Sequence, residues 1–345
     1  TRVSAGTRIE VVTEGILTRL LQDDPALSAY AVVIFDEFHE RSLQADLGLA
    51  LVRECQEVLR PDLRLLVMSA TLDPGPLAAL LGHAPVLRCD GRMFPVETRY
   101  RAPGRLPLLD HARIEILRLL REETGSLLVF LPGEGEIRRL ADALTNSLTE
   151  SLGTDVDLCP LYGQLAGDDQ DRAIAPAASG RRKVVLATAI AETSLTIEGI
   201  RVVVDAGLMR SPHFDPGSGM TRLLTQRLSQ ANAEQRRGRA GRLQPGICLR
   251  LWSEEEQSRL APFATPEILD SDLSGMVLEL AAWGVRAPDG LAWLDQPPAP
   301  AWARGSDLLQ TLEALRSDGS ITAHGQAMLR LGLPPRLAHL VLCGR

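Results

Sequence analysis

The chain has 345 residues, more than a single hydrophobic core usually organises, so we expect it to fold as several domains. Hydrophobic residues make up 45% of the sequence, and no run of about 18 apolar residues occurs, which argues against a membrane span. The formal net charge of −7 argues against a strongly basic nucleic-acid-binding domain, although net charge does not fix the charge of a local site.

The cationic residues are almost all arginine, because Lys183 is the only lysine among 37 arginines and lysines. We therefore expect phosphate contacts by long basic side chains to be made by planar guanidinium groups. The five cysteines are scattered and form no C-x-x-C motif, which predicts neither a disulfide framework nor a zinc site. We expect the cysteines to be reduced core residues of a cytoplasmic protein. The cysteines are Cys55, Cys89, Cys159, Cys248 and Cys343.

Five short apolar runs have the character of buried parallel strands, at residues 31–35, 63–68, 127–131, 184–187 and 202–204. The stretches between them show helical spacing, at residues 47–59, 114–120 and 137–148. Strands that alternate with helices predict an α/β fold with helices on both faces of parallel sheets.

This alternation breaks in two places. A Pro/Gly-rich stretch at residues 102–107 is typical of a linker. After Trp252 the sequence becomes mainly helical, over residues 267–283 and 306–317, with a Pro-rich loop at residues 296–300. The segment 320–322 is compatible with a small strand. This order indicates a small helical domain of the winged-helix type.

Two adjacent carboxylates, Asp36 and Glu37, directly follow the first apolar run. Ligands of open α/β sheets lie beyond the carboxyl ends of strands. There, one carboxylate can hold Mg²⁺, mostly through water, and the other can deprotonate an attacking water. Acidic residues also end many strands simply for solubility, so the pair needs support. His39 and the hydroxyl-bearing segment 69–71, which follows the next strand, supply it, although that segment could merely cap a helix beginning at Pro74.

The arginine-rich segment 235–242 is the most specific signal in the second half of the chain. Residues 229–234 look helical, and Arg236, Arg239 and Arg242 are spaced by three, so neighbouring pairs can share a helix face. Glycine costs about 1 kcal/mol relative to alanine in a helix, so two glycines within four residues indicate close approach to another group. An arginine pair aimed at a γ-phosphate is one reason. A solvated basic turn or a plain phosphate patch is the alternative.

Residues 187–197 form a hydroxyl-rich segment that follows a predicted strand. Hydroxyls and free backbone amides in a strand-to-helix loop suit phosphate contacts. A plain linker between two strands is the competing interpretation.

Together these motifs resemble the DEAH-box branch of superfamily 2 helicases, in order along essentially the whole chain. Asp36-Glu37-Phe38-His39 is similar to the DEAH box, with Phe in place of the usual Ala, and Ser69-Ala70-Thr71 is similar to the coupling motif. Phe38 and the segment 332–336 (Gly-Leu-Pro-Pro-Arg) resemble the bacterial HrpB type. The remaining matches are Thr13-Glu14-Gly15 and residues 130–133, 136–137, 160–163, 187–197 and 235–242.

The resemblance implies an ATP-dependent RNA helicase or RNA–protein remodeller that uses ATP and Mg²⁺ and binds single-stranded nucleic acid, RNA rather than DNA. It implies two tandem RecA-like lobes, the first incomplete, followed by a winged-helix-like domain. The corresponding ranges are 1–104, 105–252 and 253–330, with a further helical domain starting at 331–345. It gives no oligomeric state.

The resemblance also implies residue roles. Asp36 would bind Mg²⁺ and Glu37 would activate water, with His39 coupling them to Ser69 and Thr71. Gln235, Arg239 and Arg242 would close the nucleotide from the second lobe, with Ser194 also near it. A hairpin around residues 214–225 would help hold or separate strands. The residues expected along the nucleic acid are Thr13, Glu14, Gly15, Thr188 and Thr193.

The sequence departs from the helicase pattern in two respects. A P-loop needs G-x-x-x-x-G-K-[ST], but Lys183 is followed by two valines, so this chain contains none and we expect little or no ATPase activity from it alone. Because it begins with Thr1 rather than Met, we expect a truncated chain. Ala189 stands where these helicases usually carry Asn, which puts the local loop geometry in doubt. A non-catalytic nucleic-acid-binding remnant and a DNA helicase remain alternatives.

Overall fold

The computed structural model describes residues 4, 6–89, 91, 94–151, 155–192 and 195–344. The chain divides into two compact units, each built from segments that are distant in sequence. Unit 1 contains Thr1–Leu87, His213–Thr221 and Thr265–Arg345, and unit 2 contains Arg88–Pro212 and Arg222–Ala264. Within the described ranges, no helix is long and apolar enough to cross a membrane.

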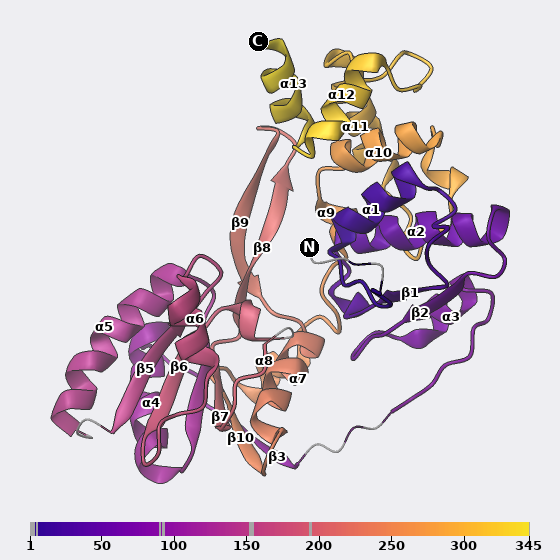
Figure 1. Ribbon diagram of the computed structural model, residues 1–345. Coiled ribbons are helices and arrows are strands. Elements are labelled where there is room, and N and C mark those ends of the chain that lie inside the picture. Colours follow the sequence, from indigo (N-terminus) through magenta and orange to yellow (C-terminus); the bar gives the residue numbers. More distant parts are fainter. Residues whose placement is uncertain are drawn as a thin grey trace. The chain divides into compact units, whose positions relative to one another are not determined.

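Unit 2 is built on a six-stranded parallel sheet with the strand order β3-β10-β7-β4-β6-β5 (Figure 1). The strands are β3 (Val96–Tyr100), β4 (Ser126–Phe130), β5 (Val156–Leu161), β6 (Arg182–Ala187), β7 (Ile200–Asp205) and β10 (Gly246–Arg250). The predicted runs at 127–131, 184–187 and 202–204 correspond to β4, β6 and β7.

Alternate residues of the central strands enter two different cores, as the two-residue period of a strand requires. Leu127 and Val129 of β4 pack in one core with helices α4 (Leu108–Glu122) and α5 (Glu134–Ser151). Leu128 and Phe130 pack in the other, which includes α6 (Gly167–Ile174). The expected α/β architecture, with a parallel sheet covered on both faces, is therefore confirmed for unit 2, and the sheet is RecA-like.

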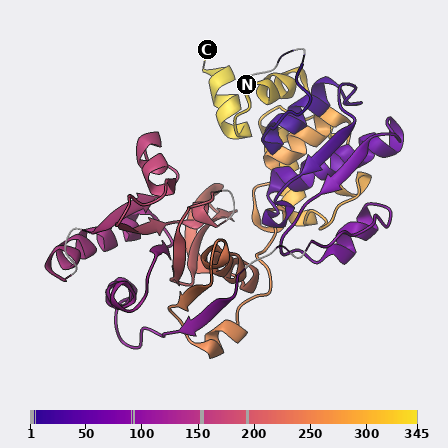
Figure 2. The same cartoon turned by 60° about the horizontal axis from the view of Figure 1, so that its bottom comes forward.

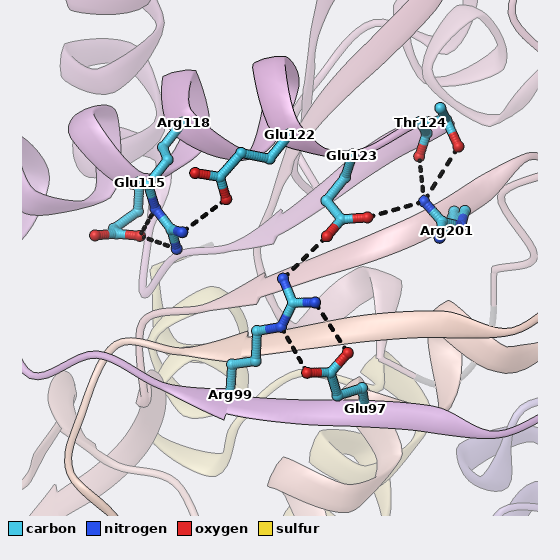
Figure 3. A network of polar contacts seen from close by, with 8 residues as sticks. All are labelled: Glu97, Arg99, Glu115, Arg118, Glu122, Glu123, Thr124 and Arg201. Carbon is cyan, nitrogen blue, oxygen red and sulfur yellow. Dashed lines mark hydrogen bonds and ion pairs between the residues drawn. The ribbon is translucent and has the colours of Figure 1, made fainter.

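Strand β3 is missing from the apolar runs of the sequence because it is a half-buried edge strand with charged residues. Its residues 96–100 pair in parallel with residues 246–250 of β10. Arg99 on β3 pairs with Glu97 and with Glu123 after α4, and Glu123 also binds Arg201 on β7 (Figure 3). The predicted first range, 1–104, thus includes a strand of unit 2, and residues 102–107 connect β3 to α4 inside that unit.

Unit 1 contains a two-stranded parallel sheet of β1 (Val32–Phe35) and β2 (Arg64–Val67), which correspond to the first two predicted runs. Val33 and Phe35 are buried, whereas Val32 and Ile34 on the opposite face are 47% and 56% exposed. The helices of this part are α1 (Glu14–Asp23), α2 (Leu43–Val58) and α3 (Pro74–Leu80). Their core is continuous with the helices after residue 265.

Those later helices are α9 (Glu267–Asp270), α10 (Ser274–Trp283), α11 (Ala299–Thr311), α12 (Ala323–Leu331) and α13 (Pro335–Cys343). Buried Arg41 connects the two parts, since its guanidinium binds Asp46 of α2 and Asp295. The Glu267 carboxylate accepts a hydrogen bond from the amide of Leu43, and the indole of Trp283 donates one to Glu54. The C-terminal helices therefore share one compact unit with β1 and β2.

Two predicted helices in this region have different bounds in the structure. The predicted helix 306–317 is α11, which begins at Ala299 and ends at Thr311, because proline is tolerated in a first helical turn, where its missing N–H has no helical partner. The predicted helical stretch 267–283 is split, since Asp272 accepts a hydrogen bond from the amide of Ser274 and starts α10 anew. The expected strand 320–322 is reduced to one antiparallel bridge between Leu315 and Ile321.

The expected hairpin is confirmed by β8 (Leu208–Asp215) and β9 (Met220–Arg227), which pair with each other. At its turn the Asp215 carboxylate accepts hydrogen bonds from the amide of Gly217 and the hydroxyl of Ser218, and Gly219 has a φ of 64°. The remaining helices of unit 2 are α7 (Gln230–Gly238) and α8 (Glu254–Ser258).

The expectation that the cysteines are core residues holds for three of them. Cys55, Cys159 and Cys248 are buried, but Cys89 and Cys343 are exposed. The sequence pattern could not show this, because a cysteine's burial depends on the face of the element that carries it.

Candidate functional site

In unit 1, the parallel pairing of β1 and β2 brings the two predicted motifs together. Phe35 and Val67 are paired in register, so both motifs begin at the same sheet edge. The amide of Met68 donates to the carbonyl of Phe35 at 2.8 Å, and the amide of Phe38 donates to the carbonyl of Met68 at 3.0 Å. The segments 36–39 and 69–71 are therefore neighbours, as strand ends in a parallel sheet should be.

Glu37 is held in a strained backbone conformation. Its φ of 50° and ψ of 34° lie in the left-handed region, which costs a side-chain-bearing residue about 1–2 kcal/mol. The Asp36 carboxylate accepts a hydrogen bond from the Glu37 amide at 2.9 Å, and the next residue, Phe38, is buried. Such strain is concentrated at functional sites, because it is kept only where the surroundings enforce it. In this conformation the Glu37 side chain is 43% exposed just beyond the end of β1.

His39 links the carboxylates to the second motif. Its side chain is only 5% exposed, and its Nδ1 accepts a hydrogen bond from the amide of Ala70 at 3.3 Å. The other ring nitrogen, Nε2, is buried and has no partner among the described residues. The same Nδ1 lies 3.5 Å from a carboxylate oxygen of Glu37. The imidazole is thus hydrogen-bonded to the backbone between Ser69 and Thr71 and lies beside Glu37.

The hydroxyl of Ser69 accepts a hydrogen bond from the amide of Leu72 at 3.2 Å, so this residue also has a local structural role. The cap of α3 itself is Asp73, whose carboxylate accepts from the amide of Gly75. Asp36 is exposed and Glu37 partly exposed. Their carboxylate oxygens are the donors that Mg²⁺ prefers, so the residues present fit the expected ion.

In unit 2, Arg236 is a buried structural residue. Its Nε donates to the Glu192 carboxylate at 2.9 Å, its Nη1 donates to the Asp205 carboxylate at 2.9 Å, and its guanidinium stacks over the ring of Phe130. Burial alone would lower the pKa of Arg236, but Asp205 and Glu192 outweigh it and raise the pKa above its ordinary value. This ion triad fixes α7 to the ends of β4 and β7.

The other two arginines of the segment have different surroundings. Arg239 is buried and donates to the main-chain carbonyls of Glu192 and Leu195. Arg242 is exposed, and its guanidinium donates to the hydroxyl of Thr196. Gln235 is half-buried on α7. The structure therefore brings the arginine-rich segment against the described residues Glu192, Leu195 and Thr196 of the hydroxyl-rich segment.

Glu192 and Asp205 are not among the residues that the sequence motifs predicted to be functional. Glu192 binds three side chains. Its carboxylate accepts hydrogen bonds from Arg236 and from Asn232 of α7, and its main-chain carbonyl accepts one from Arg239. Asp205 could have been found from the sequence, because it is a carboxylate that directly follows the apolar run 202–204. Of the predicted residues nearby, Thr188 is half-buried at the end of β6, whereas Thr193 and Ser194 lie outside the described residues.

The close approach predicted at the glycines is present at Gly241, where the neighbouring group is the backbone of Phe94. A Cβ on Gly241 would lie 2.7 Å from the carbonyl oxygen of Phe94. The amide of Phe94 donates to the Gly241 carbonyl at 2.9 Å, which leads the chain into β3. Helix α7 ends at Gly238 and continues as a 3₁₀ turn, Arg239–Gly241. This glycine is explained by packing.

Lys183 also has a structural role. Its buried ammonium group donates to the carbonyls of Arg172, Ala173 and Ala175 at the end of α6. Burial lowers the pKa of Lys183. The lone lysine is thus a C-terminal cap of a helix rather than a phosphate ligand, in agreement with the sequence around it.

The predicted nucleic-acid motif lies at the start of α1. Thr13 is the N-cap residue, and among the described residues its hydroxyl makes no capping hydrogen bond. The Glu14 carboxylate accepts from the hydroxyl of Ser42 at 3.4 Å. Thr13 and Gly15 line a cavity of about 650 Å³ in unit 1, together with Gln44 and Glu279. The cavity places the motif beside a carboxylate that the sequence did not single out.

Burial raises the pKa of Glu279 to about 7, against the lowering effects of Gln44 and Arg19, and one of its carboxylate oxygens is buried without a partner among the described residues. The folded chain therefore keeps this proton up to about pH 7, whereas the unfolded chain loses it near pH 4.5. The free energy of unfolding should fall as the pH rises through this window.

We expect Glu279→Gln to abolish this dependence and to stabilise the chain at pH 8 by about 1–3 kcal/mol, since the residue is partly exposed. Urea unfolding at pH 5 and pH 8 measures the effect. Glu57→Gln, at an exposed position of α2, is the control and should keep the wild-type pH dependence. An unchanged slope in Glu279→Gln would contradict the assignment.

Comparison with known proteins agrees with this geometry. A model of the helicase conserved C-terminal domain matches residues 111–244. Over 99% of its length the chain is 53% identical to the ATP-dependent RNA helicase HrpB of Escherichia coli (strain K12). Two crystal structures of E. coli HrpB share 54% identity with it over 99% of this chain, with TM-scores of 0.88 and 0.91. The chain belongs to the DEAH/RHA helicases of the HrpB type.

Other relatives of this helicase chain are more distant. It is 38% identical to the pre-mRNA-splicing factor ATP-dependent RNA helicase prp22 of Schizosaccharomyces pombe and 36% identical to the ATP-dependent RNA helicase HrpA of E. coli, over 99% of its length in both cases. It spans 42% of HrpB, 30% of prp22 and 26% of HrpA. The chain therefore covers less than half of these relatives.

The HrpB-type assignment made from the sequence is confirmed by these similarities. One of its two signals, the segment 332–336, joins α12 to α13 in this helicase chain. Gly332 ends α12 with a φ of 61°, and Pro334 precedes the first turn of α13. The segment is therefore a turn between helices of unit 1, where glycine and proline are conformationally suited.

Proposed function

We propose that this helicase chain is part of an ATP-dependent RNA helicase or RNA–protein remodeller of the cytoplasm. The observation that carries the proposal is the arrangement at the ends of β1 and β2. There Nδ1 of His39 accepts a hydrogen bond from the backbone amide of Ala70 and lies 3.5 Å from the carboxylate of the strained, partly exposed Glu37. The curated relatives are named as ATP-dependent RNA helicases, which supports the same conclusion.

In this proposal, Asp36 holds Mg²⁺ largely through water and Glu37 takes the proton of the attacking water, with Mg²⁺ neutralising phosphate charge when it is bound. The exposed Asp36 carboxylate can reach a hydrated ion without a desolvation penalty. His39 is hydrogen-bonded to the segment 69–71 and lies beside Glu37, so a shift of that segment would change the surroundings of the base. Ser69 and Thr71 are proposed to lie near the nucleotide.

Unit 2 is proposed to supply Gln235, Arg239 and Arg242 to the nucleotide phosphates, with Ser194 beside them. Arg242 is the best placed of the two arginines, because it is exposed and, among the described residues, hydrogen-bonds one hydroxyl. Arg239 would first have to leave the carbonyls of Glu192 and Leu195. Because Arg236 is committed to its ion triad, it is proposed only as a support for the segment.

Several finer assignments belong to the same proposal. We propose that residues 1–104 and 105–252 derive from two RecA-like lobes, the first incomplete, and that residues 253–330 form a winged-helix-like domain before the helix at 331–345. The proposed contacts with single-stranded RNA are made by Thr13, Glu14, Gly15, Thr188 and Thr193.

The experiment is ATP hydrolysis by the polypeptide of the whole reading frame, with single-stranded RNA or DNA of equal sequence. We expect stimulation by RNA to exceed that by DNA, and the 345-residue chain alone to show little turnover, because it contains no P-loop. Stimulation by DNA alone would favour a DNA helicase. Nucleic-acid binding without any hydrolysis by the whole protein would favour a non-catalytic binding protein, and normal turnover by the short chain would contradict the catalytic assignment.

A further inference from the structure

Three potential metal ligands meet on two helices near the end of the chain. His324 is the second residue of α12, and His339 and Cys343 are one helical turn apart on α13. Their ligand atoms all lie within 4.8 Å of one another, the histidines being half-buried and the cysteine exposed. Residues four apart project from the same face of a helix, which explains why His339 and Cys343 converge.

The distances approach those of a tetrahedral metal site. Nε2 of His324 lies 2.9 Å from Nδ1 of His339, and Sγ of Cys343 lies 3.8 Å from that Nδ1. Zinc bonds of about 2.0–2.1 Å to nitrogen and about 2.3 Å to sulfur give N–N and N–S separations of roughly 3.3 Å and 3.6 Å. The nitrogen–sulfur distance already fits, and the two rings need to separate by about 0.4 Å.

The supporting helices fix these side chains. Helices α12 and α13 contact each other and are joined by the short turn at Gly332 and Pro334. Both lie in the yellow, C-terminal part of the chain in Figure 2. Met328 of α12 and Ala338 of α13 are completely buried in the core of unit 1. Metal sites on packed helices are better preorganised than sites on loops.

We propose that His324, His339 and Cys343 bind a divalent transition-metal ion, Zn²⁺ foremost. Two imidazoles and a thiolate suit zinc and its neighbours, whereas Mg²⁺ and Ca²⁺ prefer oxygen donors. The ion replaces the proton that the two ring nitrogens share in the metal-free chain, and this proton moves to an outer ring nitrogen. Cys343 releases its thiol proton and binds the ion as a thiolate. Three protein ligands leave a fourth position for water.

This site is chemically separate from the Asp36 and Glu37 carboxylates and does not depend on ATP hydrolysis. The spacing of the cysteines alone predicts no zinc site, because only one of the three ligands is a cysteine. Helical spacing of His339 and Cys343 was present in the sequence, but the third ligand comes from another helix, which only the packing of α12 on α13 brings close.

The test is a Co²⁺ titration of the complete 345-residue chain after treatment with a chelator. We expect one ion per chain, visible-region absorption typical of four-coordinate Co²⁺ and a near-ultraviolet thiolate-to-cobalt band, all reversed by Zn²⁺ but not by Mg²⁺. Cys343→Ser should remove the thiolate band. His324→Ala and His339→Ala should weaken binding by at least about tenfold. Cys89→Ser, at the other exposed cysteine, is the matched control and should bind like wild type.

The Co²⁺ titration of the wild-type chain tests the proposal even where a variant fails to fold. Absence of a thiolate band from the folded wild-type chain, or less than one ion bound per chain, would overturn the proposal. A band that survives Cys343→Ser or disappears in Cys89→Ser would do the same. In addition, the midpoint of thermal unfolding should rise with Zn²⁺ in the wild-type chain and in Cys89→Ser, but not in folded Cys343→Ser.

Discussion

Replacing Arg236 with alanine is expected to lower the free energy of unfolding of the chain by about 3–5 kcal/mol, because it leaves two buried carboxylates without their cation. Asp205 is fully buried and Glu192 is 5% exposed, so neither recovers hydration when the guanidinium is removed. The stacking contact with Phe130 is lost as well. Urea unfolding followed by far-ultraviolet circular dichroism measures the change.

The neighbouring residue provides a matched control. Arg237 is partly exposed and pairs with Glu234 on the same helix, so Arg237→Ala should cost less than about 1 kcal/mol. Equal losses in the two variants, or a loss below 1 kcal/mol in Arg236→Ala, would show that the ion triad does not hold α7 in place.

Replacing Glu37 with glutamine is expected to lower the RNA-stimulated turnover of ATP by about 10²–10⁴-fold in the protein of the whole reading frame. Glutamine keeps the size of the side chain but does not accept the proton of the attacking water. Because Asp36 is unchanged, binding of a non-hydrolysable ATP analogue should be retained. Turnover and analogue binding are measured in parallel.

Glu57→Gln on the exposed face of α2 removes the same charge from unit 1 and should leave turnover unchanged. Unchanged turnover in Glu37→Gln would remove Glu37 from the role of general base. Loss of analogue binding in that variant would instead show that Glu37 acts in binding the nucleotide.

The sequence alone predicted the strands that have continuous apolar runs and the turns that are stabilised locally. The apolar runs at 31–35 and 63–68 predicted the strands β1 and β2. The carboxylates and hydroxyls that directly follow these runs were therefore expected at strand ends. Since parallel strands share the direction of their carboxyl ends, the meeting of His39 with residues 69–71 follows once β1 and β2 pair. The Asp215–Gly219 turn likewise needs only local backbone preferences.

Tertiary structure decided what depends on partners distant in sequence. Strand β3 has no apolar run and belongs to unit 2 only because its backbone pairs with β10, about 150 residues later along the chain. Arg236, Arg239 and Arg242 are the same residue type at equal spacing, yet one is in an ion triad, one binds carbonyls and one is exposed. The difference comes from Asp205 and from Glu192, Leu195 and Thr196, whose positions relative to the three arginines depend on the packing of the sheet. Burial, and with it the charge that a side chain can present to a ligand, is a property of that packing.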